Sequence, residues 1–170
     1  MRRRWCRGSE PLEMTLVGIP LIFLLITTFE MARGMWLYHT MAYSIREGTR
    51  YSVVHGLNCS LSPNSCTVTI SNIATVIQNQ DGGLSSGSLS LTFTDNSGTT
   101  TTCTLANCIA NYTSAAWPNS TNNSPGMKIK IEGTYPFTGV IAMFWPGATH
   151  ALGGYQSINL YASSKESIQF

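Results

Sequence analysis

The longest hydrophobic stretch of the chain lies near its N-terminus, where residues 14–29 form sixteen consecutive positions without a formal charge. As a helix, at about 1.5 Å per residue, this run spans ~24 Å, rather less than the ~30 Å hydrocarbon core of a bilayer. Apolar residues on either side lengthen the surface, so that a tilted helix can cross: Leu12, Met31, Met35, Trp36 and Leu37. We therefore predict a helix that begins near Ser9, with Pro11 in its first turn, and spans a membrane to about residue 30.

A second pattern continues this helix to about residue 55, where Gly56 is expected to end it. Apolar and small residues recur at alternating intervals of four and three, and charged residues occupy the other side, which is typical of an amphipathic helix. Glu30 and Arg33 have the spacing of a helical ion pair, and pairing within one helix or between subunits is equally open. The predicted buried stripe consists of Met31, Met35, Tyr38, Ala42, Ile45, Thr49 and Ser52.

After residue 56 the pattern changes to alternation of apolar and polar positions, which indicates β-strands. We predict a strand at 66–70, a short helix capped by Ser71, a turn at 81–83, a hairpin of 89–93 with 99–105, and a long polar loop at 111–126. The strand at 127–135 is expected to pair with 156–163, and the apolar segment 137–145 is expected to be a core segment or short helix. The predicted fold is α+β, with a long N-terminal helix followed by a small antiparallel-sheet domain at 56–170.

Charge is distributed unevenly along the chain. Residues 1–50 hold seven basic and four acidic residues, whereas residues 51–170 hold three and four. Arginines at 2, 3, 4 and 7 precede the apolar run, so the positive-inside rule places residues 1–8 in the cytoplasm and the domain outside. The nearly neutral domain lacks the basic surface that nucleic-acid binding requires, and we expect no nucleic-acid partner.

The cysteines suggest disulfide bonds in the exterior domain. Cys6 lies in the leader, and the four others are Cys59, Cys66, Cys103 and Cys108. Pairing of neighbours, Cys59 with Cys66 and Cys103 with Cys108, is preferred, while the two crossed connectivities stay open. The spacing includes no Cys-x-x-Cys, so a zinc site is disfavoured.

The sequence contains few of the residue patterns that are typical of enzymes. No serine-nucleophile elbow, phosphate-binding glycine loop or zinc-protease motif occurs, and we expect no catalytic activity and no cofactor. The scattered titratable residues of the domain are Asp81, Asp95, Glu132, Glu166, His55 and His150. An anchored enzyme would need a polar pocket that gathers some of them.

The first third of the chain resembles a known family. Gly8 and Glu13 are separated by four residues, and an apolar run with Pro20, the segment 29–34 (FEMARG), Ala42 and the segment 46–51 (REGTRY) follow in order. This order is similar to that of the TadE-like pilins and pseudopilins of tight-adherence (Tad) type IV pilus systems. One position departs, since similar proteins commonly carry an aromatic residue where this chain has Met14.

The resemblance implies that a prepilin peptidase cleaves after Gly8, so that Ser9 becomes the N-terminus. The helix would then leave the bacterial inner membrane and pack against other pilin subunits in a filament or its assembly base. A carboxylate costs on the order of 2–3 kcal/mol inside lipid, and the new Ser9 amine would supply the counter-charge for Glu13. Pro20 removes a hydrogen bond to the Leu16 carbonyl and is expected to loosen the helix there.

Two other kinds of N-terminus compete with this interpretation. A cleaved secretory signal is disfavoured, because no small-x-small site follows the apolar run. An uncleaved signal anchor survives this test, and the chain would then be a membrane-anchored binding module or adhesin. Retention of residues 1–8 on the mature protein distinguishes it from a pilin.

Overall fold

The computed structural model describes residues 10–56, 68–139 and 157–169 of the 170-residue chain. The described residues belong to two compact units, one containing residues 10–35 and 138–139 and the other the remainder. Helix α1, Glu10–Val54, contributes to both units. The predicted helix at 9–55 agrees with these bounds to within one residue at each end.

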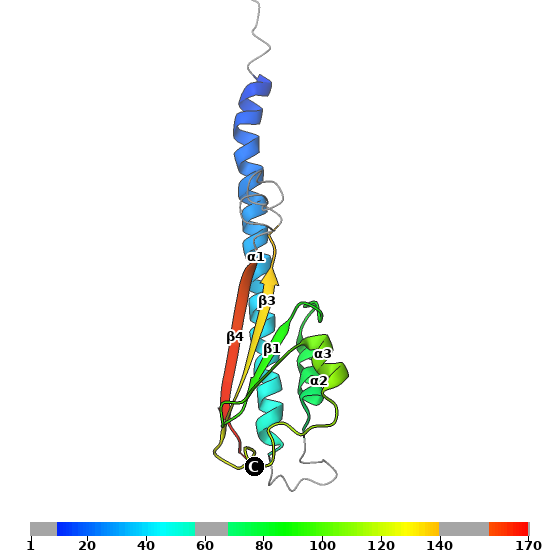
Figure 1. Ribbon diagram of the computed structural model, residues 1–170. Helices are drawn as coiled ribbons and strands as arrows, with labels where there is room; N and C mark the ends of the chain where they lie inside the picture. Colours follow the sequence, from blue (N-terminus) through cyan, green and yellow to red (C-terminus); the bar gives the residue numbers. More distant parts are fainter. Residues whose placement is uncertain (1–9, 57–67, 140–156, 170) are drawn as a thin grey trace, which may run out of the picture. The chain divides into compact units, whose positions relative to one another are not determined.

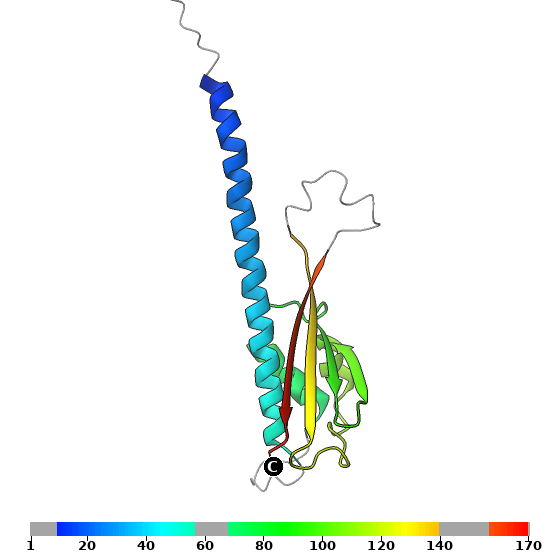
Figure 2. The same ribbon diagram turned by 90° about the vertical axis from the view of Figure 1, so that its left-hand side faces the viewer.

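The second unit contains a four-stranded antiparallel sheet with the order β2-β1-β3-β4. Its strands are β1 Ser90–Thr94, β2 Thr100–Thr104, β3 Lys128–Phe137 and β4 Ile158–Ser167. The predicted hairpin is confirmed, with Phe93 opposite Thr101, and so is the long-range pairing, in which Ile131 lies opposite Ser164. Figure 1 looks onto the outer face of this sheet, and Figure 2, turned by 90°, shows the C-terminal part of α1 along the other face.

The inner face of the sheet packs against α1. Leu91, Phe93, Ile129 and Ile131 alternate along β1 and β3 and are completely buried. Gly133 allows the closest approach, because a Cβ atom built there would overlap the Cδ1 atom of Ile45 on α1. The alternation that predicted these strands therefore also identifies the face that forms the core.

The buried face of α1 begins closer to the C-terminal end of the helix than predicted. Ile45, Thr49 and Ser52 are buried as expected, but Met31 and Met35 of the predicted stripe are 68% and 60% exposed. A helical stripe is buried only along the length where another element covers it, and here the sheet and a second helix cover α1 from about residue 41 onward. The prediction missed four residues of this covered face: Met41, Ser44, Gly48 and Val53.

The helix that covers α1 with the sheet is α2, Ile70–Gln80. Its buried residues include Ile73 and Ile77, and a Cβ at Gly48 of α1 would lie 2.6 Å from Ile77 Cγ1. The predicted cap was wrong: Thr69, not Ser71, caps α2, and its side chain accepts a hydrogen bond from the Asn72 amide. The helix begins at Ile70, so the strand expected at 66–70 is reduced, within the described residues, to a single bridge between Thr69 and Ala116.

A short helix, α3 Leu105–Asn111, directly follows β2 and was not predicted. Cys103 at the end of β2 and Cys108 in α3 form a disulfide, with 5.4 Å between their Cα atoms. This confirms one of the two preferred pairings. Cys6, Cys59 and Cys66 lie outside the described residues.

The predicted polar loop follows α3 and reaches β3, and it contains a cis peptide bond between Trp117 and Pro118. The Trp117 ring packs edge-on against Phe93, with 5.2 Å between the ring centroids. Trp117 of this mostly polar loop is thus part of the hydrophobic core. Most of the apolar segment 137–145 lies outside the described residues, so its expected role is untested.

Candidate functional site: the N-terminal part of α1

The first part of α1 carries a large exposed apolar surface. Its hydrophobic side chains between Leu12 and Phe29 include eleven that are 49% to 77% exposed, and none of the most apolar window of the helix is buried in the structure. In the part of the chain that the structure describes, α1 is the single helix long and apolar enough to cross a membrane. These eleven are Leu12, Met14, Leu16, Val17, Ile19, Leu21, Ile22, Phe23, Leu24, Leu25 and Phe29.

The hydroxyl groups in this apolar surface are satisfied by the helix itself. Thr15 donates to the Leu12 carbonyl, and Thr27 donates to the Phe23 carbonyl at 2.7 Å. Thr28 donates in the same way to the carbonyl of Leu25. Polar groups in a hydrocarbon environment must find partners inside the protein, and these threonines do so without a second chain.

The helix continues through Pro20, with residues on both sides in helical conformation. Proline has no N–H to donate to the Leu16 carbonyl, so one hydrogen bond is missing in the middle of the apolar surface. Transmembrane helices tolerate such a position. The predicted loosening therefore does not end the helix.

Glu13 lies one turn into α1 and is exposed. A carboxylate near the N-terminus of a helix interacts favourably with the helix dipole, which gives Glu13 a stabilising role independent of assembly. Gly8 and Ser9, the predicted processing site, lie outside the described residues. The pairing of Glu13 with the Ser9 amine consequently stays a prediction.

Glu30 and Arg33 are brought together at the end of the apolar surface. Arg33 Nη2 lies 3.1 Å from Glu30 Oε2, and the same nitrogen donates to the Thr138 carbonyl at 2.5 Å. The Glu30 side chain is 16% exposed and that of Arg33 is 48% exposed. The structure contains the pairing within a chain, and pairing between subunits stays a prediction. The contact of Arg33 to the Thr138 carbonyl could not be predicted from local spacing.

Two carboxylates of the second unit, Asp81 and Asp95, have local structural roles. Asp81 accepts a hydrogen bond from the Gly83 amide in the turn after α2. Asp95, in the turn between β1 and β2, accepts hydrogen bonds from Ser97 Oγ at 2.6 Å, from the Thr99 amide at 3.0 Å and from Asn122 Nδ2 at 3.0 Å. Burial raises the pKa of Asp95, but these hydrogen bonds outweigh it and hold the pKa below its ordinary value of 3.8.

Metal-ligating side chains do not gather in the described ranges 10–56, 68–139 and 157–169: no three His, Cys, Asp or Glu residues there could hold one ion. His55 contacts the Tyr51 carbonyl through Nδ1 at 2.7 Å, and His150 lies outside these ranges. Comparison of the chain with protein-family models, with curated proteins and with solved structures gives no match. The exposed apolar part of α1 is therefore the feature from which a function can best be argued.

Proposed function

We propose that this chain is a pilin-like subunit, similar to the TadE-like proteins of tight-adherence pilus systems, that assembles through the N-terminal part of α1. The observation that carries this proposal is the exposed apolar surface between Leu12 and Phe29, on a helix that continues into a folded domain. Apolar surface of this extent is unfavourable in water, so lipid or neighbouring helices must cover it.

Lipid can cover the apolar surface of α1 first, and neighbouring helices can cover it after assembly. A helix that is apolar on all sides fits lipid before assembly and a bundle of identical helices afterwards, because helices in a bundle and lipid chains offer similar apolar contacts. The internally bonded threonines suit both environments. The second unit, with its own buried core, would travel with the helix as the exterior part of the subunit.

Processing provides the switch between these states in our proposal. Cleavage after Gly8 removes four arginines and creates a positively charged amine on Ser9. Glu13 would pair with this amine in its own or a neighbouring subunit and so fix the register between helices. Before cleavage the arginine-rich leader would hold residues 1–8 in the cytoplasm and the domain outside the inner membrane.

The decisive experiment compares the intact mass and N-terminal sequence of the protein from membranes with and without an active prepilin peptidase. A peptidase-dependent start at Ser9 supports the pilin pathway. A retained Met1 in both membranes overturns it and favours the uncleaved, signal-anchored binding module. A peptidase-independent start within or after α1 would instead indicate ordinary signal-peptide removal and would also overturn the proposal.

A further inference from the structure

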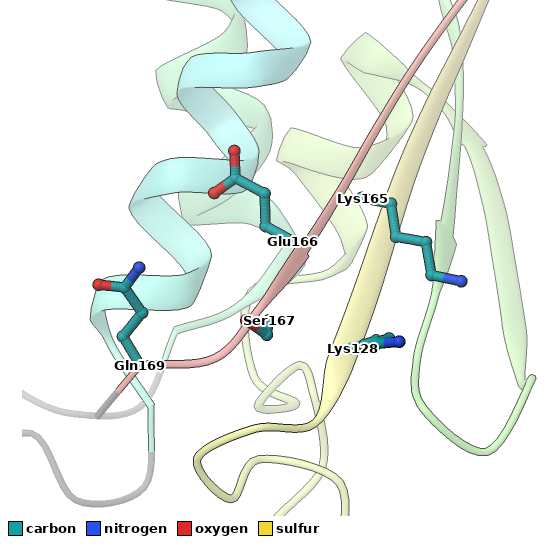
Figure 3. A pocket seen from close by; sticks show the side chains of 5 residues that line it. All are labelled: Lys128, Lys165, Glu166, Ser167 and Gln169. Atoms are coloured by element: carbon teal, nitrogen blue, oxygen red, sulfur yellow. The ribbon is translucent and has the colours of Figure 1, made fainter.

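All three lysines of the chain lie together on the outer face of the sheet. Lys128 and Lys130 alternate with buried residues on β3, and Lys165 of β4 is the direct cross-strand partner of Lys130. Figure 3 shows Lys128 and Lys165 extending to the same side of the strands, whereas Glu166 lies on the other side, toward α1. Lysines 37 positions apart in the sequence thus form one cationic cluster.

This cluster contains more positive than negative charge. Like charges directly opposite each other on neighbouring strands destabilise a sheet. Lys130 is compensated by Glu132 on the same face, with 2.7 Å between Nζ and Oε1. Among the ion pairs of the described residues none involves Lys128 or Lys165, so these two ammonium groups are available to an anion.

The two available lysines line a hollow in the surface. An open depression of about 540 Å³ is lined by Lys128, Lys165, Glu166, Ser167 and Gln169, and Figure 3 labels these five side chains. Long lysine side chains around a depression can bring their ammonium groups onto one bound anionic group. The depression is the cationic end of a longer surface.

A second hollow follows the same two strands. It has a volume of about 280 Å³, and its lining residues include threonines, a serine, Glu132 and Tyr161, which is 65% exposed. At ~3.3 Å per residue, the stretch of β3 from Lys128 to Thr134 is ~20 Å long. The lining residues are Thr92, Glu132, Gly133, Thr134, Tyr161, Ala162 and Ser163.

The chemistry of this second hollow favours a sugar over a nucleic-acid strand. Sugars offer hydroxyl donors to the Glu132 carboxylate, hydroxyl acceptors to threonine and serine, and an apolar ring face to Tyr161. The phosphodiester groups of a nucleic-acid strand offer acceptors and negative charge but no hydroxyl donors for the Glu132 carboxylate. A carboxylate-bearing sugar chain matches both hollows at once.

We infer that the outer face of β3 and β4 binds an acidic glycan, with a sugar carboxylate at Lys128 and Lys165 and neighbouring sugars over Glu132 and Tyr161. The residues of this glycan face are Lys128, Lys130, Glu132, Thr134, Tyr161, Ser163, Lys165 and Ser167. The face lies within the second unit, so binding depends neither on cleavage after Gly8 nor on assembly through α1.

The test measures binding of polygalacturonate to the full-length protein in a non-ionic detergent, with the fully methyl-esterified polymer as the neutral counterpart. We expect polygalacturonate to bind and the esterified polymer to bind about tenfold more weakly or less, because esterification removes the charge that the lysines recognise. The Lys128→Gln/Lys165→Gln double variant should lose about tenfold in affinity for polygalacturonate. Tyr161→Ala should lose about threefold to tenfold, as expected for one aromatic contact.

The matched control is Arg46→Gln/Arg50→Gln, which removes the same number of positive charges from α1 and should change affinity by less than about twofold. An unchanged thermal midpoint shows that each variant is folded. The inference is overturned if the lysine variant binds normally, if both double variants lose affinity equally, or if no polymer binds. It is also overturned if a single-stranded oligonucleotide of matched charge binds as tightly with the same lysine dependence, which would identify a nucleic-acid surface instead.

Discussion

The two parts of α1 differ in the exposure of their apolar side chains. Between Leu12 and Phe29 most hydrophobic side chains are exposed, whereas in the later part of α1 Met41, Ile45 and Val53 are buried on the side that the sheet and α2 cover. Both parts belong to one helix without an interruption. Both parts are therefore helical, but only the later part is covered by other elements of the same chain.

A threonine hydroxyl is satisfied in the same way in each of the two parts. Thr27 donates to the carbonyl four residues earlier, and so does Thr49 in the buried part, at 2.8 Å. A hydroxyl removed from water needs a hydrogen bond whether lipid or protein surrounds it. What differs is the width of the apolar surface: a complete circumference requires lipid or other helices, and a single face requires only the chain's own sheet.

The largest expected effect comes from two isoleucines on this one helix. Ile45→Ala removes a fully buried side chain and should lower the free energy of unfolding of the domain by about 2–5 kcal/mol. Ile22→Ala, at a position 56% exposed, should change it by less than about 0.5 kcal/mol. Denaturant unfolding of the full chain in detergent measures both, and equal losses would contradict the division of α1 into two parts.

A second pair of variants tests the proposed assembly function on glutamates of the same helix. Glu13→Ala should leave membrane insertion and cleavage intact but reduce incorporation into filaments about tenfold or more, because a charge pair inside an apolar bundle is lost. Glu47→Ala removes an exposed ion pair with Arg50 and should leave incorporation unchanged. Quantitative blotting of sheared filaments gives the ratio, and normal incorporation of the Glu13 variant would refute the pairing of Glu13 with Ser9.

Asp95 has a buried carboxylate that accepts hydrogen bonds in the turn between β1 and β2. Asp95→Asn should lower the free energy of unfolding at pH 7 by about 1–3 kcal/mol, because it removes charge-assisted hydrogen bonds. The pKa of Asp95 is lower in the folded state than its ordinary value of 3.8, so its stabilising contribution is complete above that pH and is lost as the pH falls through the folded-state pKa.

Unfolding of the native protein and the Asn variant between pH 7 and pH 2 measures this contribution. The difference in stability between the two proteins should narrow below about pH 4. Glu132→Gln, an exposed carboxylate on the sheet, is the control and should cost no more than about 1 kcal/mol. A difference that stays constant down to the lowest pH would show that the carboxylate charge of Asp95 does not stabilise the fold.

The smallest expected effect compares two glycines of α1. Gly48→Ala places a Cβ 2.6 Å from Ile77 Cγ1, and the crowding should outweigh the improved helix propensity, for a net loss of about 1 kcal/mol. Gly18→Ala meets no atom within 4 Å and should leave the unfolding of the domain unchanged. Thermal unfolding in detergent distinguishes them, and a stabilised Gly48 variant would mean that α2 can move away from α1.

Local patterns were sufficient where the structure depends on residues close in sequence. The hairpin of β1 and β2 followed from alternation and a turn at Asp95, and the strong alternation in β3 identified both the strand and its buried face. The same reasoning misplaced the cap of α2 by two residues, because Thr69 and Ser71 are both capable caps. It also missed α3, whose seven residues carry too little periodicity to be recognised.

Sequence by itself determined that this chain has one long helix, that the helix changes from apolar to amphipathic near residue 30, and that a small antiparallel sheet follows. These properties depend on hydrophobic periodicity, which each segment carries by itself. Tertiary structure decided which face of α1 is buried, that Gly48 and Gly133 permit close packing, that Arg33 reaches the Thr138 carbonyl, and that three lysines share one face. These depend on which segments meet in space, and contacts between residues as distant as Lys130 and Lys165 leave no mark on the local pattern of either segment.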